Sequence, residues 1–203
     1  MISRTVSYID QFQELKVTAP EAAQRLLGCE FIRELDGKMV RVRIVETEAY
    51  DQTDPASHAY KGITPRSHSM FEAAGHLYVY FTYGMHYCCN VVAGEEGYGA
   101  GVLIRAVEPL EGGDVLAARR LGRIDASVSN GPGKLCQALG IDKSLDGHYL
   151  VQPPLQLLMQ PALNKNEIVT TTRIGISQAT DTPWRYYVKG NQYVSRSPRI
   201  VTE

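Results

Sequence analysis

The 203-residue sequence predicts an α+β fold, with a strongly curved, mostly antiparallel β-sheet, surrounding helices and a protruding β-hairpin. Two observations support this class. Strand-like runs follow one another through tight turns, as antiparallel pairing allows, and the helical segments between them are few and short. The chain has no repeat period and no linker-like stretch, so we expect residues 1–203 to form a single domain.

The N-terminal part predicts a helix and then a hairpin. The run Thr18-Ala19-Pro20-Glu21 combines an N-cap residue, a proline in the first turn and a glutamate, and it predicts a helix from Ala19 to Leu27. Gly28 can end this helix. Strands are expected from Cys29 to Leu35 and from Met39 to Tyr50, joined by a tight turn at Asp36-Gly37.

A long loop and a second hairpin follow. Residues 51–67 are rich in Asp, Thr, Pro, Ser and Gly and have no period, which predicts a loop of a length that is often functional. The β-rich runs Leu77–Thr82 and Tyr87–Ala93 flank Tyr83-Gly84-Met85-His86 and predict a hairpin with a bulky tip. The tip side chains either project into solvent or fold back onto the core.

The run Gly101–Val107 predicts a strand buried on both faces, although Arg105 interrupts it. A buried arginine needs a partner, so we expect an ion pair with a carboxylate such as Glu46, Glu48 or Glu108, or an escape to the sheet edge. The other predicted elements are helices over Gly112–Leu121 and from Asn130-Gly131-Pro132-Gly133-Lys134 to Leu139, and strands over Leu155–Met159, Ile168–Ile176 and Trp184–Lys189.

Composition narrows the class of protein. A hydrophobic fraction of 44% and a charged fraction of 21% are typical of a soluble globular protein. The formal net charge of -1 gives no global attraction to nucleic acid, so DNA binding would depend on local basic patches. No segment has the length and apolarity of a signal peptide or a membrane span, so we expect an intracellular, soluble monomer without a membrane partner. Neither a zinc site nor a disulfide framework is indicated by the spacing of Cys29, Cys88, Cys89 and Cys136.

The stretch Arg43–Tyr50 ends a β-branched run in two carboxylates and a tyrosine. Strict alternation would place six side chains on one face of the strand: Val40, Val42, Ile44, Glu46, Glu48 and Tyr50. A core face that becomes acidic indicates a cleft, where desolvation raises the pKa of a carboxylate and prepares a general base. The alternative is a strand that runs out into solvent.

Three chemistries are compatible with these residues. The first is a metal site that would use Glu46, Glu48, His58 and His68. The second is hydrolysis, with Glu48 as the general base, Arg105 as its orienting partner and tyrosines stacked on a flat substrate. The third is a non-catalytic nucleic-acid-binding module. A phosphate would suit the helix start beside Lys134, where backbone N–H groups are exposed.

Four segments occur in order along the chain: Arg43–Tyr50, Leu77–Met85, Leu103–Gly112 and Gly131–Leu139. Together they resemble the alkyladenine (3-methyladenine or methylpurine) DNA glycosylase family, in that family's order and over about Ala23 to Ser195. The resemblance implies a base-excision DNA repair enzyme that flips alkylated or deaminated purines out of double-stranded DNA and hydrolyses their N-glycosidic bond. The implied substrates are 3-methyladenine, 7-methylguanine, hypoxanthine and ethenoadenine. No cofactor is implied.

The resemblance also implies roles for individual residues. Glu48 would activate the attacking water, which Arg105 and the backbone carbonyl of Ile174 would help to hold. The pocket for the flipped purine would be formed by Tyr50, His58, Tyr80, Asn90 and Leu103, with Asn90 rejecting the 2-amino group of guanine. Tyr83 would be the wedge in the minor groove. Further DNA contacts would come from Met85, Thr64, Arg66 and Lys134, with Arg119, Arg120 and Arg123 as additional phosphate candidates.

Two departures from the family pattern affect these assignments. The hairpin tip has His86 after Met85, where relatives often carry an aromatic residue, and the loop between Tyr50 and His58 is one residue shorter than in some relatives. A glycosylase that also cuts the DNA backbone needs an amine nucleophile, and only Lys134 lies in a motif near phosphate. We therefore expect a monofunctional enzyme.

Overall fold

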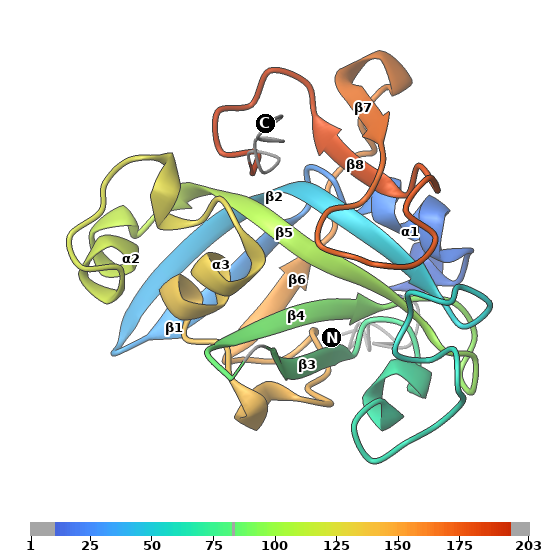
Figure 1. Ribbon diagram of the computed structural model, residues 1–203. Coiled ribbons are helices and arrows are strands. Elements are labelled where there is room, and N and C mark those ends of the chain that lie inside the picture. Colours follow the sequence, from blue (N-terminus) through green and yellow to red (C-terminus); the bar gives the residue numbers. More distant parts are fainter. Residues whose placement is uncertain (1–10, 83, 196–203) are drawn as a thin grey trace, which may run out of the picture.

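The computed structural model describes residues 11–82 and 84–195 and confirms the predicted α+β class (Figure 1). A curled antiparallel sheet forms a half-barrel with strand order β3-β4-β5-β2-β1-β6, and β8 pairs with β2 and β7. The strands are β1 (Glu30–Leu35), β2 (Lys38–Asp51), β3 (Leu77–Thr82), β4 (His86–Val92), β5 (Ala100–Glu111), β6 (Leu155–Leu158), β7 (Ile168–Thr171) and β8 (Arg185–Val188). The α-helices are α1 (Ala19–Arg25), α2 (Gly113–Arg119) and α3 (Pro132–Leu139).

Helix α1 begins as its sequence predicts. The backbone N–H and the hydroxyl of Thr18 both donate to Glu21 Oε2, at 3.1 and 2.6 Å, so the predicted N-cap is a capping box. The helix ends at Arg25, two residues before the predicted Leu27, and the chain turns into β1 through Gly28 at φ +86°.

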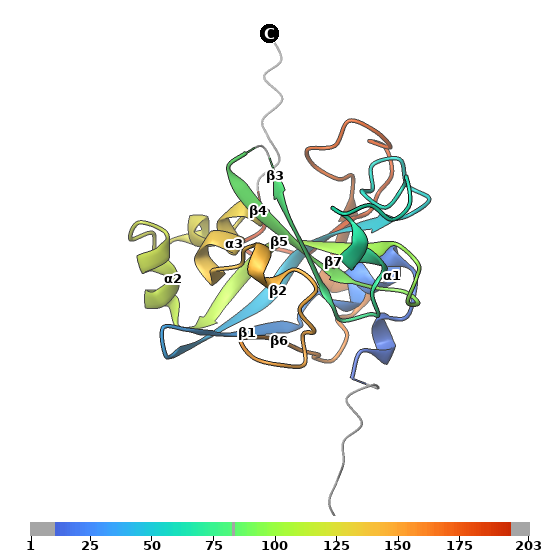
Figure 2. The same cartoon turned by 90° about the horizontal axis from the view of Figure 1, so that it is seen from below.

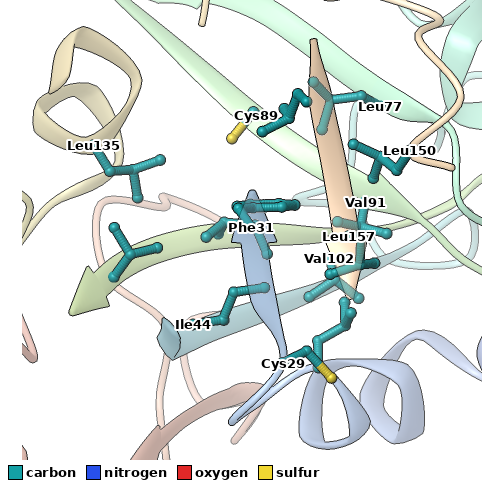
Figure 3. Close-up of a cluster of buried hydrophobic side chains, with 14 of the residues drawn as sticks. Cys29, Phe31, Ile44, Leu77, Cys89, Val91, Val102, Leu135, Leu150 and Leu157 are labelled. Atoms are coloured by element: carbon teal, nitrogen blue, oxygen red, sulfur yellow. The ribbon is translucent and has the colours of Figure 1, made fainter. Parts of the chain in front are cut away.

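The half-barrel encloses the main apolar core, and Figure 3 shows side chains from several strands meeting inside it. Helix α1 packs against β2 and β5, whereas α3 packs against β4 and β5. Along β3, Leu77 and Val79 point into this core, and the intervening Tyr78 lines a cavity on the other face of the sheet. The sheet therefore separates an apolar core from a cavity.

Strand β2 does not keep the strict alternation that the sequence suggests. Its pairing with β5 is irregular between Ile44 and Thr47, and the core-facing position changes from Ile44 before the irregularity to Ala49 after it. A bulge places an extra residue in a strand and so exchanges its two faces. The prediction that Ile44 shares a face with the acids is therefore wrong: Glu46, Glu48 and Tyr50 lie on the face opposite the core.

The predicted strand Ile168–Ile176 is too long. Strand β7 ends at Thr171, and the residues after it form turns and bends around Gly175 at φ +77°. This segment lies beside the loop that follows β2, as Figures 1 and 2 both show. A buried ion pair between Arg173 and Asp54 connects the two loops. That tertiary contact ends the strand and brings Ile174 to the end of β2.

The remaining boundaries differ from the prediction by a few residues. Strand β5 continues to Glu111, beyond the predicted Val107, and α2 ends at Arg119 before Leu121, which adopts φ +57°. Within residues 11–82 and 84–195, no helix combines the length and apolarity that a membrane crossing requires.

Candidate active site

A cavity of about 610 Å³ lies on the face of the sheet opposite the main core. Strands β2 to β5, the loop that follows β2, the start of α3 and the segment after β7 all contribute to its lining. Eight of the predicted site residues line it: Tyr50, His58, Tyr80, Asn90, Leu103, Arg105, Lys134 and Ile174. Residues that are up to 124 positions apart in the chain thus meet in one place.

Glu48 lies directly beneath the wall of this cavity and is fully buried. Its Oε2 accepts from the hydroxyl of Tyr50 at 2.9 Å and pairs with Nη1 of Arg105 at 3.1 Å. Its Oε1 accepts from the backbone N–H of Ile174 at 2.7 Å. All three donors line the cavity. The carboxylate is therefore fixed in one orientation, and burial together with Glu48 raises the pKa of Tyr50, which remains a donor.

Arg105 has the carboxylate partners that its burial requires, which confirms the predicted ion pair. It bridges Glu48 and Glu46, because its Nε donates to Glu46 Oε1 at 3.0 Å. Glu108, the third candidate partner, pairs with Arg43 instead. The bridge depends on the bulge in β2, since only the exchanged faces bring both acids to the side of Arg105.

The segment after β7 is attached to the site through Arg173. Its guanidinium pairs with Asp54, donates to the carbonyl of Ala49 at 2.9 Å and lies 4.8 Å from the ring centroid of Tyr50. This anchor places the next residue, Ile174, against Glu48. The hydrogen bond from the N–H of Ile174 to Glu48 was not predicted from the sequence. The role of the Ile174 carbonyl in holding water stays a prediction.

Aromatic side chains form one wall of the cavity. The rings of His58 and Tyr80 meet edge to face at 4.6 Å, and Tyr78 stacks against Tyr80 at 5.5 Å. The hydroxyl of Tyr78 is 2.9 Å from Nδ1 of His58. Sequence reasoning missed Tyr78, although its alternation with Tyr80 along β3 predicts a shared face.

Burial sets the protonation of this wall. Desolvation, with a contribution from the nearby Arg66, lowers the pKa of His58 to about 4, so the imidazole is neutral at neutral pH. Desolvation likewise raises the pKa of Tyr78 to about 12 and that of the cavity-lining Cys88 to about 11. The wall is therefore uncharged, and Cys88 is a thiol rather than a nucleophilic thiolate.

The amide of Asn90 is buried, and its Nδ2 donates to the carbonyl of Tyr78 at 3.3 Å. Leu103 lies beside it on β5, opposite Asn90 in the register of β4 and β5. Both residues line the cavity as expected. The rejection of a 2-amino group by Asn90 stays a prediction.

The predicted DNA-contacting residues surround the mouth of the cavity or the hairpin. The exposed Arg66 lies 5.4 Å from the ring centroid of Tyr80. It lies in a turn that Thr64 closes through its hydroxyl contact with Ser67 at 2.8 Å. Lys134 donates to Asn130 at 2.7 Å. Met85 is 68% exposed and does not fold back onto the core. The predicted wedge, Tyr83, lies outside the described residues.

The structure does not support the metal alternative. Glu46 and Glu48 are paired with Arg105, whereas His58 bonds to Tyr78 and His68 to Ser69. Within the described part of the chain, no group of three or more His, Cys, Asp or Glu side chains could hold a metal ion. The four residues are therefore not arranged as a ligand set.

A buried, oriented carboxylate beside an aromatic cavity is an arrangement that could support hydrolysis next to a planar ring. A family model described as Methylpurine-DNA glycosylase matches residues 13–192. The chain belongs to this family and is a DNA N-glycosylase, a hydrolase whose substrate is DNA. The non-catalytic binding module, the alternative function considered from the sequence, is therefore wrong.

Similar proteins cover most of the chain. One from Carboxydothermus hydrogenoformans is 48% identical over 175 residues, which are 86% of this chain and 92% of the relative. One from Methanoculleus marisnigri is 49% identical over 177 residues, with the same two coverages. One from Nitrosospira multiformis is 43% identical over 183 residues, 90% of this chain and 92% of the relative. Each carries the name "Putative 3-methyladenine DNA glycosylase".

Proposed function

We propose that the enzyme flips alkylated or deaminated purines out of double-stranded DNA and hydrolyses their N-glycosidic bond, with Glu48 as the general base. The substrates would be 3-methyladenine, 7-methylguanine, hypoxanthine and ethenoadenine. The names of the relatives support the first of these. The observation that carries the proposal is the fully buried carboxylate of Glu48, held by three donors that all line the cavity.

The pattern of donors indicates where the attacking water would bind. A carboxylate has about four lone-pair sites, two on each oxygen. Oε2 of Glu48 uses two, on Tyr50 and Arg105, whereas Oε1 uses one, on the N–H of Ile174. The remaining site on Oε1 would accept a hydrogen bond from one O–H of the water, and the carbonyl of Ile174 would accept a hydrogen bond from the second O–H.

The reaction consumes one water molecule. Its oxygen attacks C1′ of the sugar as the glycosidic bond breaks, the bonding electron pair leaves with the purine, and the water proton passes to Glu48. The sugar passes through an oxocarbenium-like state that carries positive charge. The buried carboxylate of Glu48, held in place by its donors, would stabilise that charge.

The aromatic wall would select the flipped base. The ring of Tyr50 lines the cavity, where it would stack on a purine, and it also lies 4.8 Å from the guanidinium of Arg173. Electron-rich ring faces attract the positive charge of an alkylated purine, by about 0.5 to 2 kcal/mol for each favourable ring. The neutral imidazole of His58 adds a polar edge without repelling a cationic base. Damaged bases also unstack more easily than normal ones, which favours their entry.

The decisive experiment compares Glu48→Gln with wild type in the excision of hypoxanthine and methylated purines from duplex DNA. Loss of the general base should reduce the single-turnover rate by about 10²- to 10⁴-fold, while binding to DNA with an abasic analogue is retained. Glu108→Gln is the matched control, because Glu108 is a carboxylate that pairs with Arg43 on the same two strands. A wild-type rate in Glu48→Gln would remove Glu48 from the chemical step.

We also propose that the enzyme is monofunctional. Lyase chemistry needs an unprotonated amine that forms a Schiff base with the sugar, and Lys134 is the cavity-lining lysine among the described residues. Burial and two nearby arginines lower the pKa of Lys134, but its amine is engaged by Asn130. Borohydride should therefore trap no covalent complex with hypoxanthine-containing DNA. A trapped adduct that Lys134→Ala abolishes would identify Lys134 as a nucleophile.

A further inference from the structure

Glu46 is a second buried acid that the mechanism above leaves without a role. It is fully buried and does not line the cavity. Its carboxylate accepts four contacts: Arg105 Nε at 3.0 Å, Arg185 Nε at 2.6 Å, and the N–H and hydroxyl of Ser195 at 2.6 and 2.8 Å. Three of these contacts are on Oε1 and one is on Oε2, so four donors fix the carboxylate in a place that does not face the cavity.

The contacts of Glu46 connect it to Glu48 through one guanidinium. Arg105 donates from Nε to Glu46 and pairs through Nη1 with Glu48, so its single positive charge is divided between two carboxylates. Arg185 pairs with Glu46 on its other side. The result is a buried row of alternating charges in the order Glu48, Arg105, Glu46, Arg185. The row has no net charge, as burial of four ions requires.

We propose that Glu46 and Arg185 are positioning residues that adjust how strongly Arg105 attracts Glu48, and that they thereby set how readily Glu48 takes a proton from water. This inference rests on the proposed role of Glu48. Glu46 withdraws part of the charge of Arg105 from Glu48, and Arg185 in turn withdraws part of the charge of Glu46. Removal of either residue should therefore change the basicity of Glu48, in opposite directions.

The direction of each change follows from the order of charges. Without the charge of Glu46, two unopposed guanidinium groups favour the ionised form of Glu48, which then binds a proton only at lower pH. Without Arg185, Glu46 draws more strongly on Arg105 and also repels Glu48, which then binds a proton at higher pH. At an effective dielectric constant of about 20, two charges several ångströms apart interact strongly enough to shift a pKa by roughly 1 to 2 units.

The other ionisable groups near Glu48 do not change their charge in the assay. The protonation of Glu48 therefore depends on the two acids and their arginines. Burial raises the pKa values of Tyr50 and Tyr80, and that of Cys88 to about 11, so all three stay neutral across an assay range of about pH 5 to 9. His58 is neutral over the same range. Arg173 pairs with Asp54 and is not altered by either substitution.

The test is the pH dependence of single-turnover excision of hypoxanthine from duplex DNA by the full-length protein. An uncharged base departs less readily than an alkylated one, so its release depends more on the general base. In Glu46→Gln the acid limb of the profile should move to lower pH by about 1 unit, with a several-fold lower plateau, because a weaker base accepts the proton less readily. In Arg185→Met the acid limb should move to higher pH by about 1 unit.

Two further variants separate charge from shape. Arg185→Lys keeps the positive charge and should restore a profile close to that of wild type. Ser195→Ala removes one neutral donor from Glu46 and leaves the backbone N–H in place, so it should move the acid limb in the same direction as Arg185→Met, but by less. Ser195→Ala also provides the measurement if Glu46→Gln does not fold. Binding to abasic-analogue DNA checks that each variant is folded.

The outcomes distinguish this inference from the one on which it rests. If Glu48→Gln keeps the wild-type rate, the general-base proposal fails. If Glu48→Gln loses excision but Glu46→Gln and Arg185→Met keep the wild-type acid limb, only the positioning inference fails. A purely structural role for Glu46 would lower the folded fraction and move neither limb. Shifts of both variants in the same direction would also contradict the proposed row of charges.

Discussion

The two ends of strand β2 carry charged side chains of the same kinds in opposite surroundings. In its first half, Arg41 and Arg43 pair with Glu30 and Glu108, and the arginine side chains are 45% and 43% exposed. In its second half, Glu46 and Glu48 are fully buried and pair with Arg105. The bulge that exchanges the faces of β2 separates the two halves.

This difference shows what each set of pairs can do. An exposed ion pair stabilises a protein by about 0 to 1 kcal/mol, because water screens the charges and the side chains lose freedom. A buried pair pays a desolvation cost of several kcal/mol for each ion and persists only when its lone pairs are satisfied. Seven contacts hold these two carboxylates, four on Glu46 and three on Glu48. We infer that the buried half serves orientation and chemistry, and the exposed half serves solubility and register.

Among the variants that test this difference between the two halves of β2, Arg105→Met should have the largest effect on stability. Loss of the bridging guanidinium would leave two buried carboxylates with one arginine, and should lower the free energy of unfolding in urea by about 3 to 5 kcal/mol at neutral pH. The loss should shrink as pH falls, because protonation of Glu46 or Glu48 removes the unpaired charge.

Arg43→Met is the matched control for Arg105→Met. It removes an arginine from an exposed pair on the neighbouring strand, and the expected loss is about 0 to 1 kcal/mol. Equal losses in the two variants, measured in parallel at several pH values, would show that burial does not divide β2 as we describe.

Local signals in the sequence were sufficient for much of the fold. The capping box at Thr18 and Glu21 fixes the start of α1, and β3 has the bounds that its β-branched and aromatic run predicts. The need of a buried arginine for a counter-charge predicts the partners of Arg105. Each of these inferences depends on residues near one another in the chain or on one strong energetic requirement.

The parts that could not be predicted depend on contacts between distant segments. Nothing around Ile44 signals the bulge, since the irregularity arises where β2 must pair with both β5 and β8. Ile168–Ile176 has strand-like composition throughout, but Arg173 leaves the strand for Asp54, which is 119 positions away in the chain. The positions of Glu46 and Ile174 at the site follow from these two events.

A smaller effect on stability is expected at His58, a titratable group in the same cavity that forms no ion pair within the described residues. Burial and the nearby Arg66 lower its pKa to about 4, whereas the unfolded chain should have the ordinary histidine value of about 6.5. Between these two values the unfolded state binds more protons than the folded state, so stability is lost as pH falls from about 6.5 to about 4.

The contribution of His58 should reach on the order of 1 to 2 kcal/mol after allowance for its partial exposure. In His58→Gln this component disappears, so the difference in unfolding free energy between wild type and variant should change with pH across that window, while His68→Gln, at an exposed ring, is the matched control. A pH-independent difference for His58→Gln would mean that the imidazole keeps its charge in the cavity. The contrast with Glu48 would then fail, since a buried group at this site would be charged without a partner.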